Sequence, residues 1–214
     1  MTPPINECRI SCAPPSVYYI PDFITPTEER VLVEKVLGAP KPKWVHLKNR
    51  RFQEAGVFQE LDANQHDPNH CLVNEYLAGQ GIMPHTDGPA YMPTVATVSL
   101  SSHCVLEFYK IPEDQDNSST KTNNSRGQEP EFALFVQPRS LLVLKEDIYN
   151  KYTHGIREVI SDDLNQGNIL NLPEAAPEVS NHPSGSTLAE RGTRISLTFR
   201  IVQKTLSKKL FLRR

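Results

Sequence analysis

The 214-residue sequence has few of the features that mark secreted or membrane-spanning proteins. Its apolar runs stay far below the roughly 20 residues that cross a bilayer, and its N-terminus has neither the basic nor the apolar segment of a secretory leader. Cysteines are few, and none forms a Cys-x-x-Cys pair: they are Cys8, Cys12, Cys71 and Cys104. We therefore expect a soluble protein without membrane contact, with reduced thiols, in the cytoplasm and the nucleus.

A large net charge is also lacking, since 23 basic residues face 25 acidic ones and the formal net charge is −2. This balance excludes a polycation whose binding rests on overall charge. The basic residues are unevenly distributed, however, because residues 41–51 contain no acid and no acid follows Glu190. These stretches fit either a nucleic-acid contact, with Trp44 placed to stack on a base, or an ordinary solvated surface. The residues considered as contacts to DNA or RNA are Lys41, Lys43, Lys48, Arg50, Arg51, Lys208, Lys209, Arg213 and Arg214.

Proline, at 18 residues, is abundant and favours short elements over long helices. Residues 1–15 carry four prolines, and we interpret them as a flexible tail before a short strand at residues 17–20. One helix is well signalled after that strand, because Thr25 suits the N-cap, Pro26 the first helical position and Glu28 a capping box. Gly38 ends this helix. Its predicted buried face consists of Val31, Leu32, Val33, Val36 and Leu37.

Short runs rich in β-branched and aromatic residues follow from about residue 71. They are Leu72–Leu77, Ile82–His85, Thr94–Leu100, Val105–Tyr109, Phe132–Val136, Ser140–Leu144 and Arg194–Val202. These seven runs predict a mainly β protein, an antiparallel sandwich or barrel with the helix on its flank. Two polar stretches, 112–130 and 161–191, have the composition of long mobile surface loops. We thus expect one domain over residues 16–202 and a basic tail over 203–214.

The motif His85-Thr86-Asp87 is the sharpest chemical feature of the sequence. On an extended strand, residues i and i+2 point to the same side, so the imidazole and the carboxylate would lie together with Thr86 turned away. A third ligand is available in His154, although each of these residues is also compatible with an ordinary polar role. Two histidines and one carboxylate with open positions suit non-haem Fe(II), whereas structural zinc prefers four closed ligands.

The last predicted strand alternates strictly, which places four polar side chains on one face and apolar ones on the other. An Arg-x-Ser pair on such a face offers a planar fork and a hydroxyl that suit a carboxylate. A second polar pair, an amide and a phenol, lies on the strand before the His-x-Asp motif. Both sets are equally compatible with half-exposed strands. The residues of the two sets are Arg194, Ser196, Thr198 and Arg200, and Asn74 and Tyr76.

In this order, Asn-x-Tyr, His-x-Asp, a distal His and Arg-x-Ser-x-Thr-x-Arg resemble the signature of the AlkB-type 2-oxoglutarate- and Fe(II)-dependent dioxygenases. Segments 18–24, 39–44, 81–89 and 191–194 extend the resemblance over about residues 16–202. It implies a double-stranded β-helix, a cupin-like jelly-roll core. It also implies hydroxylation of a C–H bond with Fe(II), 2-oxoglutarate and O2. On an N-methyl group of alkylated nucleic acid, this reaction would release formaldehyde and leave the demethylated product.

The same resemblance assigns the site residues. Iron would be held by His85, Asp87 and His154. The cosubstrate 2-oxoglutarate would be held by Asn74, Tyr76, Arg194, Ser196 and Arg200, with Arg194 on its distal carboxylate.

One stretch departs from the family pattern. Only 22 residues, Phe52 to Val73, separate Arg51 from Asn74, where the family usually has a longer lid over the nucleotide. The shortened lid leaves two alternatives open: a jelly-roll module that binds nucleic acid or protein without turnover, and a hydroxylase of proteins or small molecules. The stretch 161–191 is a candidate to cover the site instead. A monomer is expected.

Overall fold

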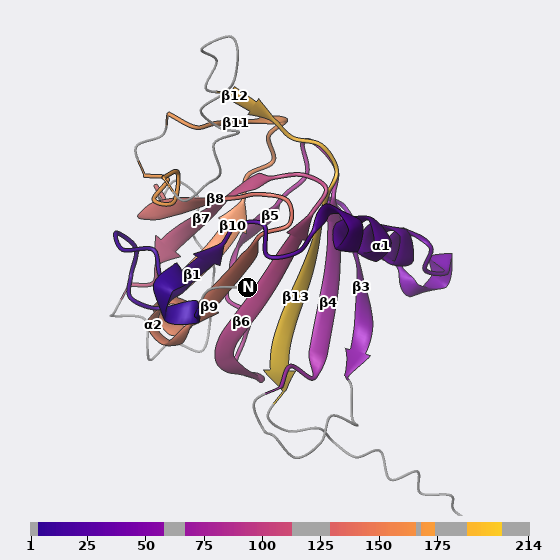
Figure 1. Cartoon of the computed structure of the whole chain (residues 1–214), viewed down its shortest axis with the longest axis horizontal. Coiled ribbons are helices and arrows are strands. Elements are labelled where there is room, and N and C mark those ends of the chain that lie inside the picture. The colour runs from indigo at the N-terminus through magenta and orange to yellow at the C-terminus, as the bar shows by residue number, and fades with distance from the viewer. Residues whose placement is uncertain (1–3, 58–66, 113–128, 166–167, 174–187, 203–214) are drawn as a thin grey trace, which may run out of the picture.

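Two antiparallel β-sheets form the body of the protein in a computed structural model, which describes residues 4–57, 67–112, 129–165, 168–173 and 188–202 (Figure 1). The larger sheet has the strand order β1-β9-β6-β13-β4-β3-β2, the smaller has β5-β10-β7-β8, and a separate pair joins β11 to β12. The strands are β1 (Val17–Ile20), β2 (Val45–Leu47), β3 (Arg50–Val57), β4 (His70–Tyr76), β5 (Ile82–His85), β6 (Tyr91–Leu100), β7 (Cys104–Lys110), β8 (Phe132–Val136), β9 (Leu141–Lys145), β10 (Tyr152–Ile156), β11 (Ser161–Asp163), β12 (Leu188–Glu190) and β13 (Arg194–Val202). The helices are η1 (Ile5–Cys8), α1 (Pro26–Leu37), η2 (Lys41–Lys43) and α2 (Glu146–Lys151). The predicted mainly β fold is confirmed.

The main hydrophobic core holds the two sheets together. Leu142 of β9 and Tyr19 of β1 come from the larger sheet, and Phe108 of β7 and Leu134 of β8 come from the smaller one. Phe108 stacks on the ring of Phe132 with 4.6 Å between the ring centroids. Because side chains from both sheets belong to this cluster, the two sheets pack face to face, and side chains on their inner faces are shielded from solvent.

Helix α1 covers the outer face of the larger sheet. Its N-terminus has the predicted capping box, in which Thr25 accepts a hydrogen bond from the Glu28 amide and Glu28 accepts one from the Thr25 amide. Leu32, Val33 and Val36 pack against apolar side chains of the sheet, among them those of β13. Two members of the predicted buried face point elsewhere, since Val31 is 37% exposed and Leu37 is 49% exposed. The apolar stripe is therefore narrower than predicted.

The N-terminal segment corrects the prediction of a flexible tail over residues 1–15. From residue 4 onward the chain is folded: it forms η1, and Arg9 makes a β-bridge with Tyr18. Ile10 is fully buried in the main core, which a free tail would not allow. The isolated apolar residue gave no periodic signal, so its burial depends on tertiary packing.

The stretch 161–191, predicted to be a mobile loop, contains ordered structure over its described parts. Leu164 and Ile169 pack with Phe135 on the outer face of the smaller sheet. Strand β11 pairs with β12, and Asp162 and Arg191 form a buried two-pronged ion pair with distances of 2.6 and 2.7 Å. The described parts of the stretch therefore form an extra layer on that face and do not cover the inner pocket described below.

Several predicted segments lie outside the described residues: most of the loop 112–130, part of the stretch 161–191, and the basic tail 203–214. No helix within the described part of the chain is long and apolar enough to cross a membrane.

Candidate active site

Strand pairing brings the two polar motifs of the larger sheet together. Arg194 of β13 stands opposite Tyr76 of β4, and Ser196 stands opposite Asn74. Their alternating neighbours on β13 face α1, so the polar side chains face the interior between the sheets. Arg194 and Ser196 are buried accordingly. The interpretation of this alternation as a half-exposed strand is thus wrong, because both faces of β13 are covered.

The candidate metal ligands come from the smaller sheet and the turn that follows β5. His154 of β10 pairs directly with His85 of β5, and their ring centroids lie 4.6 Å apart. Asp87 lies just beyond the end of β5, with its Oδ2 atom 3.9 Å from Nε2 of His154. Because β5 ends at His85, strict alternation does not extend to Thr86, which lines the same pocket and does not turn away.

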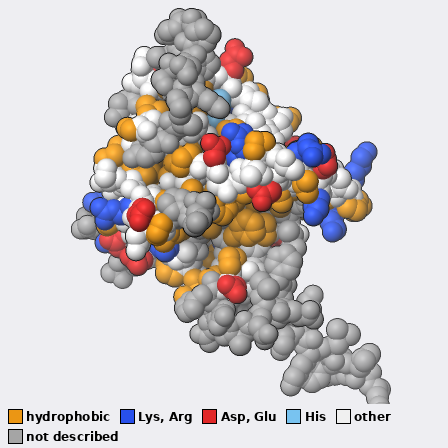
Figure 2. Space-filling model, in the orientation of Figure 1, with side chains coloured by type: hydrophobic (Ala, Val, Ile, Leu, Met, Phe, Trp, Pro, Cys, Tyr) orange, Lys and Arg blue, Asp and Glu red, His pale blue; other side chains and the backbone are white. Residues whose placement is uncertain are grey.

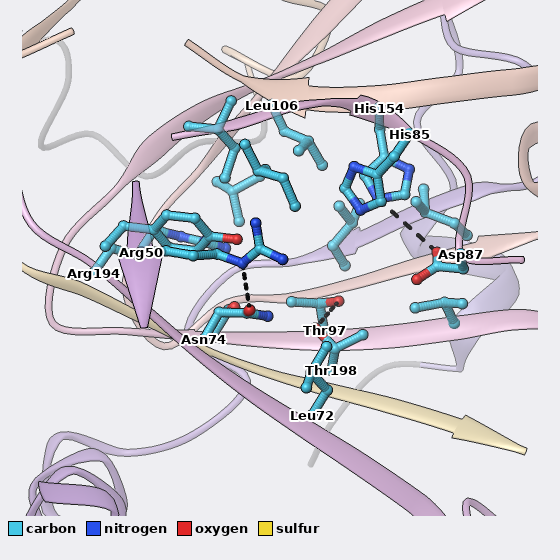
Figure 3. A pocket seen from close by; sticks show the side chains of 18 of the residues that line it. Arg50, Leu72, Asn74, His85, Asp87, Thr97, Leu106, His154, Arg194 and Thr198 are labelled. Carbon is cyan, nitrogen blue, oxygen red and sulfur yellow. Dashed lines mark hydrogen bonds and ion pairs between the residues drawn. The ribbon is translucent and has the colours of Figure 1, made fainter. Parts of the chain in front are cut away.

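All eight predicted site residues line one pocket of about 260 Å³ between the sheets. A water molecule needs only about 10–15 Å³ of such space, so the pocket has room for a small-molecule ligand. Figure 3 shows His85, Asp87 and His154 at one end, with Asn74 and Arg194 toward the other. The walls between combine apolar residues such as Leu72, Val95 and Leu106 with the hydroxyl side chains of Thr97 and Thr198.

The two arginines of β13 have different partners. Arg194 donates from Nη2 to Oγ of Ser99 at 2.8 Å, whereas Arg200 forms an ion pair with Asp87. In both side chains Nε is buried, and within the described part of the chain it has no hydrogen-bond partner. A buried N–H without an acceptor costs free energy, so these two atoms mark positions where an anionic ligand would be stabilised. Arg194 and Arg200 serve different parts of the pocket, which agrees with their separation of six residues along a strand.

The protonation states of the histidines suit metal binding. Burial lowers the pKa of His154 to about 4, with a further contribution from His85, and burial also lowers the pKa of His85. Both imidazoles are therefore neutral near pH 7 and keep a lone pair. Nδ1 of His85 lies 2.9 Å from the carbonyl oxygen of Met83. A hydrogen bond from Nδ1–H to that carbonyl leaves Nε2 as the free donor atom, which is the usual arrangement of a metal-bound histidine.

The donor set fits iron in its chemistry. Two neutral imidazoles and a carboxylate at one end of a pocket are the ligands of a non-haem Fe(II) site with open positions. Among the described residues, no three His, Cys, Asp or Glu side chains are already drawn together to hold a metal ion. Asp87 is instead paired with Arg200. Metal binding would therefore require the carboxylate of Asp87 to divide its oxygens between the cation and this guanidinium.

The basic run at residues 41–51 divides into groups with different roles. Arg51 makes a two-pronged ion pair with Glu75 and lies 4.2 Å from the ring centroid of Trp44. Trp44 is itself buried, so the prediction that it stacks on a base is wrong. Arg50 lines the pocket and donates from Nε to Oδ1 of Asn74 at 3.2 Å (Figure 3). The basic run predicts that Arg50 lies on the outer surface, and the structure corrects this. Because Arg50 and Arg51 are adjacent on β3, their side chains point to opposite faces of the sheet, and that of Arg50 points into the pocket. The candidate contacts at residues 208–214 lie outside the described residues.

Residues 40–200 match the family model described as "2OG-Fe(II) oxygenase superfamily". The chain belongs to this superfamily. It is 41% identical to the zebrafish (Danio rerio) protein named "Probable RNA/DNA demethylase ALKBH6", over 94% of this chain and 91% of that protein. The predicted resemblance to AlkB-type dioxygenases is confirmed. The protein is an oxidoreductase whose chemistry uses Fe(II), 2-oxoglutarate and O2.

Other relatives are more distant. The Xenopus tropicalis protein named "tRNA (carboxymethyluridine(34)-5-O)-methyltransferase alkbh8" is 25% identical over 93% of this chain, which spans only 33% of that relative. Among solved structures, OsALKBH1 superposes with a TM-score of 0.55 at 12% identity, over 88% of this chain and 97% of that one. HygX from Streptomyces hygroscopicus, solved with nickel, 2-oxoglutarate and hygromycin B, gives 0.50 at 11% identity, over 89% and 84%. These likenesses confirm the jelly-roll fold.

Within the described parts of the shortened stretch between Arg51 and Asn74, the chain forms the end of β3 and the start of β4, which pair with each other. Strand β3 continues to Val57 and pairs with β4 from Arg51↔Glu75 to Val57↔His70, with an irregularity after Glu54. Residues 58–66, which lie between the two strands in the sequence, are outside the described residues.

Proposed function

We propose that this oxygenase removes N-linked methyl groups from nucleic acid by oxidising the methyl carbon. One observation carries the proposal: the same pocket is lined by an iron-type donor set and by two arginines whose buried Nε atoms have no hydrogen-bond partner among the described residues. The 41% identical relative named "Probable RNA/DNA demethylase ALKBH6" supports nucleic acid as the substrate.

In this proposal, His85, Asp87 and His154 hold the iron. Bound iron and 2-oxoglutarate supply the chemistry, in which 2-oxoglutarate and O2 yield succinate and CO2 while a substrate C–H bond becomes C–OH. The pairing of Arg200 with Asp87 orients this carboxylate. A hydroxylated N-methyl group then separates as formaldehyde.

The other end of the pocket would orient the cosubstrate. Arg194, held by Ser99, presents its unpartnered Nε–H to the distal carboxylate, as a planar guanidinium suits a carboxylate. Ser196, Asn74 and Tyr76 add a hydroxyl, an amide and a phenol along the same wall. Burial raises the pKa of Tyr76, which keeps its phenol protonated and able to donate a hydrogen bond.

The test measures succinate and formaldehyde released from a single-stranded oligonucleotide that carries an N-methylated base. The wild-type protein should release both in equal amounts, and only when Fe(II), 2-oxoglutarate and O2 are present. Asp87→Ala and His85→Ala should abolish release. His46→Ala, which changes an exposed histidine of β2, should retain it. Equal turnover by the Asp87→Ala variant and the wild-type protein would refute the assigned iron ligands. Release of succinate without formaldehyde by the wild-type protein would refute demethylation.

A further inference from the structure

The backbone that carries Asp87 lies beyond the strand pairing of the smaller sheet. Strand β5 ends at His85, the residue that pairs with His154, and β6 does not begin until Tyr91. Among the described residues, no backbone-to-backbone hydrogen bond involves residues 87–89. The position of this candidate metal ligand therefore depends on contacts made by side chains.

Two side chains hold this stretch, which we call the Asp87 turn. Arg200 forms an ion pair with the carboxylate of Asp87. The phenol of Tyr149 donates a hydrogen bond of 2.5 Å to the carbonyl oxygen of Gly88, whose φ of +98° is a conformation that favours glycine. Arg200 thus orients the side chain of Asp87, whereas Tyr149 holds the backbone directly after it.

Helix α2 connects the Asp87 turn with the strand that carries His154. Ile148 of this helix is 2% exposed and belongs to the main hydrophobic core, so it anchors α2 between the sheets. Tyr149 is the next residue, and β10 follows the end of the helix without a break. One short helix therefore leads into the strand of His154 and also supplies the phenol that holds the turn of Asp87.

We propose that Tyr149 is a positioning residue of the metal site, which sets the place of Asp87 relative to His154 through the carbonyl of Gly88. This inference rests on the proposed function, because it takes Asp87 and His154 as iron ligands. Without the phenol hydroxyl, the Gly88 carbonyl loses its donor and the turn is held only by Arg200. The carboxylate would then turn toward the guanidinium and away from a bound cation, since its two oxygens must serve both.

Titration of Mn(II) into the metal-free full-length protein, followed by the electron paramagnetic resonance signal of unbound Mn(II), tests this role. Tyr149→Phe removes only the hydroxyl and should weaken Mn(II) binding by about tenfold, which is the lower end of the effect of outer partners of metal ligands. Tyr152→Phe is the matched control, because its phenol donates to Glu131 at 2.8 Å and not to the Asp87 turn. Its Mn(II) affinity should equal that of the wild type.

A second variant tests the turn itself. At Gly88 an added Cβ meets no atom within 4 Å, but the positive φ strains any other residue, so Gly88→Ala should also weaken Mn(II) binding. Because both changes act on one turn, the Tyr149→Phe and Gly88→Ala double variant should lose less affinity than the product of the two single losses.

Thermal denaturation separates positioning from a general loss of stability. Metal-free Tyr149→Phe and Tyr152→Phe should show similar small decreases in unfolding temperature, because each loses one hydrogen bond. Surface charge is not a complication. Helix α2 lies beside β9, whereas Figure 2 shows Lys and Arg side chains gathered at the end where α1 leads into η2, at the other side of the larger sheet. A loss of Mn(II) affinity confined to Tyr149→Phe therefore reports on the pocket.

Three results would overturn the role of Tyr149: unchanged Mn(II) affinity in Tyr149→Phe, an equal loss in Tyr152→Phe, or a double variant whose loss equals the product of the single losses. If the wild-type protein binds no Mn(II), this role and the assigned iron site fail together.

The role of Tyr149 and the demethylase fail in distinguishable ways. Unchanged Mn(II) affinity in Tyr149→Phe, together with formaldehyde release by the wild type, refutes the role alone. Weakened Mn(II) binding in Tyr149→Phe, without formaldehyde release by the wild type, supports the role and refutes the demethylase.

Discussion

Replacing Arg194 by lysine tests the proposed cosubstrate end of the pocket, because it keeps the positive charge and removes the planar fork. Arg194 is 6% exposed, and Nη2 already donates to Ser99. Its Nε has no partner in the described residues, so it is the N–H that a bound carboxylate would gain. Lysine would lose at least one hydrogen bond to a charged group, worth about 1.5–3 kcal/mol. The affinity for 2-oxoglutarate should fall by about 10- to 150-fold.

The effect should appear in KM and not in kcat, since the distal carboxylate does not take part in bond cleavage. Succinate release gives both constants, and calorimetric titration of 2-oxoglutarate into the Mn(II)-loaded protein gives the affinity directly. Ser99→Ala is the matched control: it removes only the hydroxyl that anchors Arg194, and KM should rise by about 2- to 10-fold. An unchanged 2-oxoglutarate affinity in Arg194→Lys, or a loss confined to kcat, would refute the assignment of Arg194.

Three further substitutions test the fold and the site. Asp162→Ala leaves the buried guanidinium of Arg191 without a counter-charge and should lower the free energy of unfolding by about 3–5 kcal/mol. Glu34→Ala, which removes one partner of an exposed ion pair on α1, should lower it by about 0.5 kcal/mol or less. Chemical denaturation measures both values, and similar losses in the two variants would contradict the buried pair. Gly155→Ala places a Cβ 2.9 Å from a backbone nitrogen of β5 and should weaken Mn(II) binding by displacing the neighbouring histidine, while Gly192→Ala, whose nearest contacts are 3.6 Å, should not; equal Mn(II) affinities would contradict this. Arg50→Gln should raise the KM for 2-oxoglutarate, because the guanidinium orients the amide of Asn74 in the pocket, and an unchanged KM would place Arg50 outside cosubstrate binding.

Local sequence patterns were sufficient to predict those helices and strands whose bounds are set by residues close together in the chain. The capping box at Thr25 and Glu28 predicted the start of α1 to the residue, because a cap is satisfied within one turn. The alternation from Arg194 to Val202 predicted β13 with its observed bounds. The sequence did not predict strand β10, because its five residues include Gly155 and show neither alternation nor an apolar run.

Features that depend on distant partners could not be predicted. Arg51 looked like part of an unpaired basic run, but its partner Glu75 is brought beside it by the pairing of β3 with β4. Trp44 looked available to a base, although the same pairing and the cover by α1 bury it. Ile10 and Leu164 were assigned to mobile segments, and both pack into cores formed by strands far along the chain. In each case the burial or pairing of the residue depends on a segment far away in the sequence. A single sequence does not show which strands pair or in which register.

The candidate site shows the same division. The order and spacing of the motifs predict His85, Asp87 and His154 as one site, and the pairing of β5 with β10 places the two histidines side by side. The ion pair between Asp87 and Arg200 was not foreseen, because it joins residues 113 positions apart. Nor was the direction of the Arg50 side chain, which lines the pocket.

A crystal structure of the protein with Mn(II) and 2-oxoglutarate, grown without O2, tests the central claim most directly. We expect one metal ion bound by His85, Asp87 and His154, with 2-oxoglutarate reaching from that ion to the guanidinium of Arg194. A metal ion bound elsewhere, or 2-oxoglutarate that leaves the Nε atom of Arg194 without a partner, would contradict it.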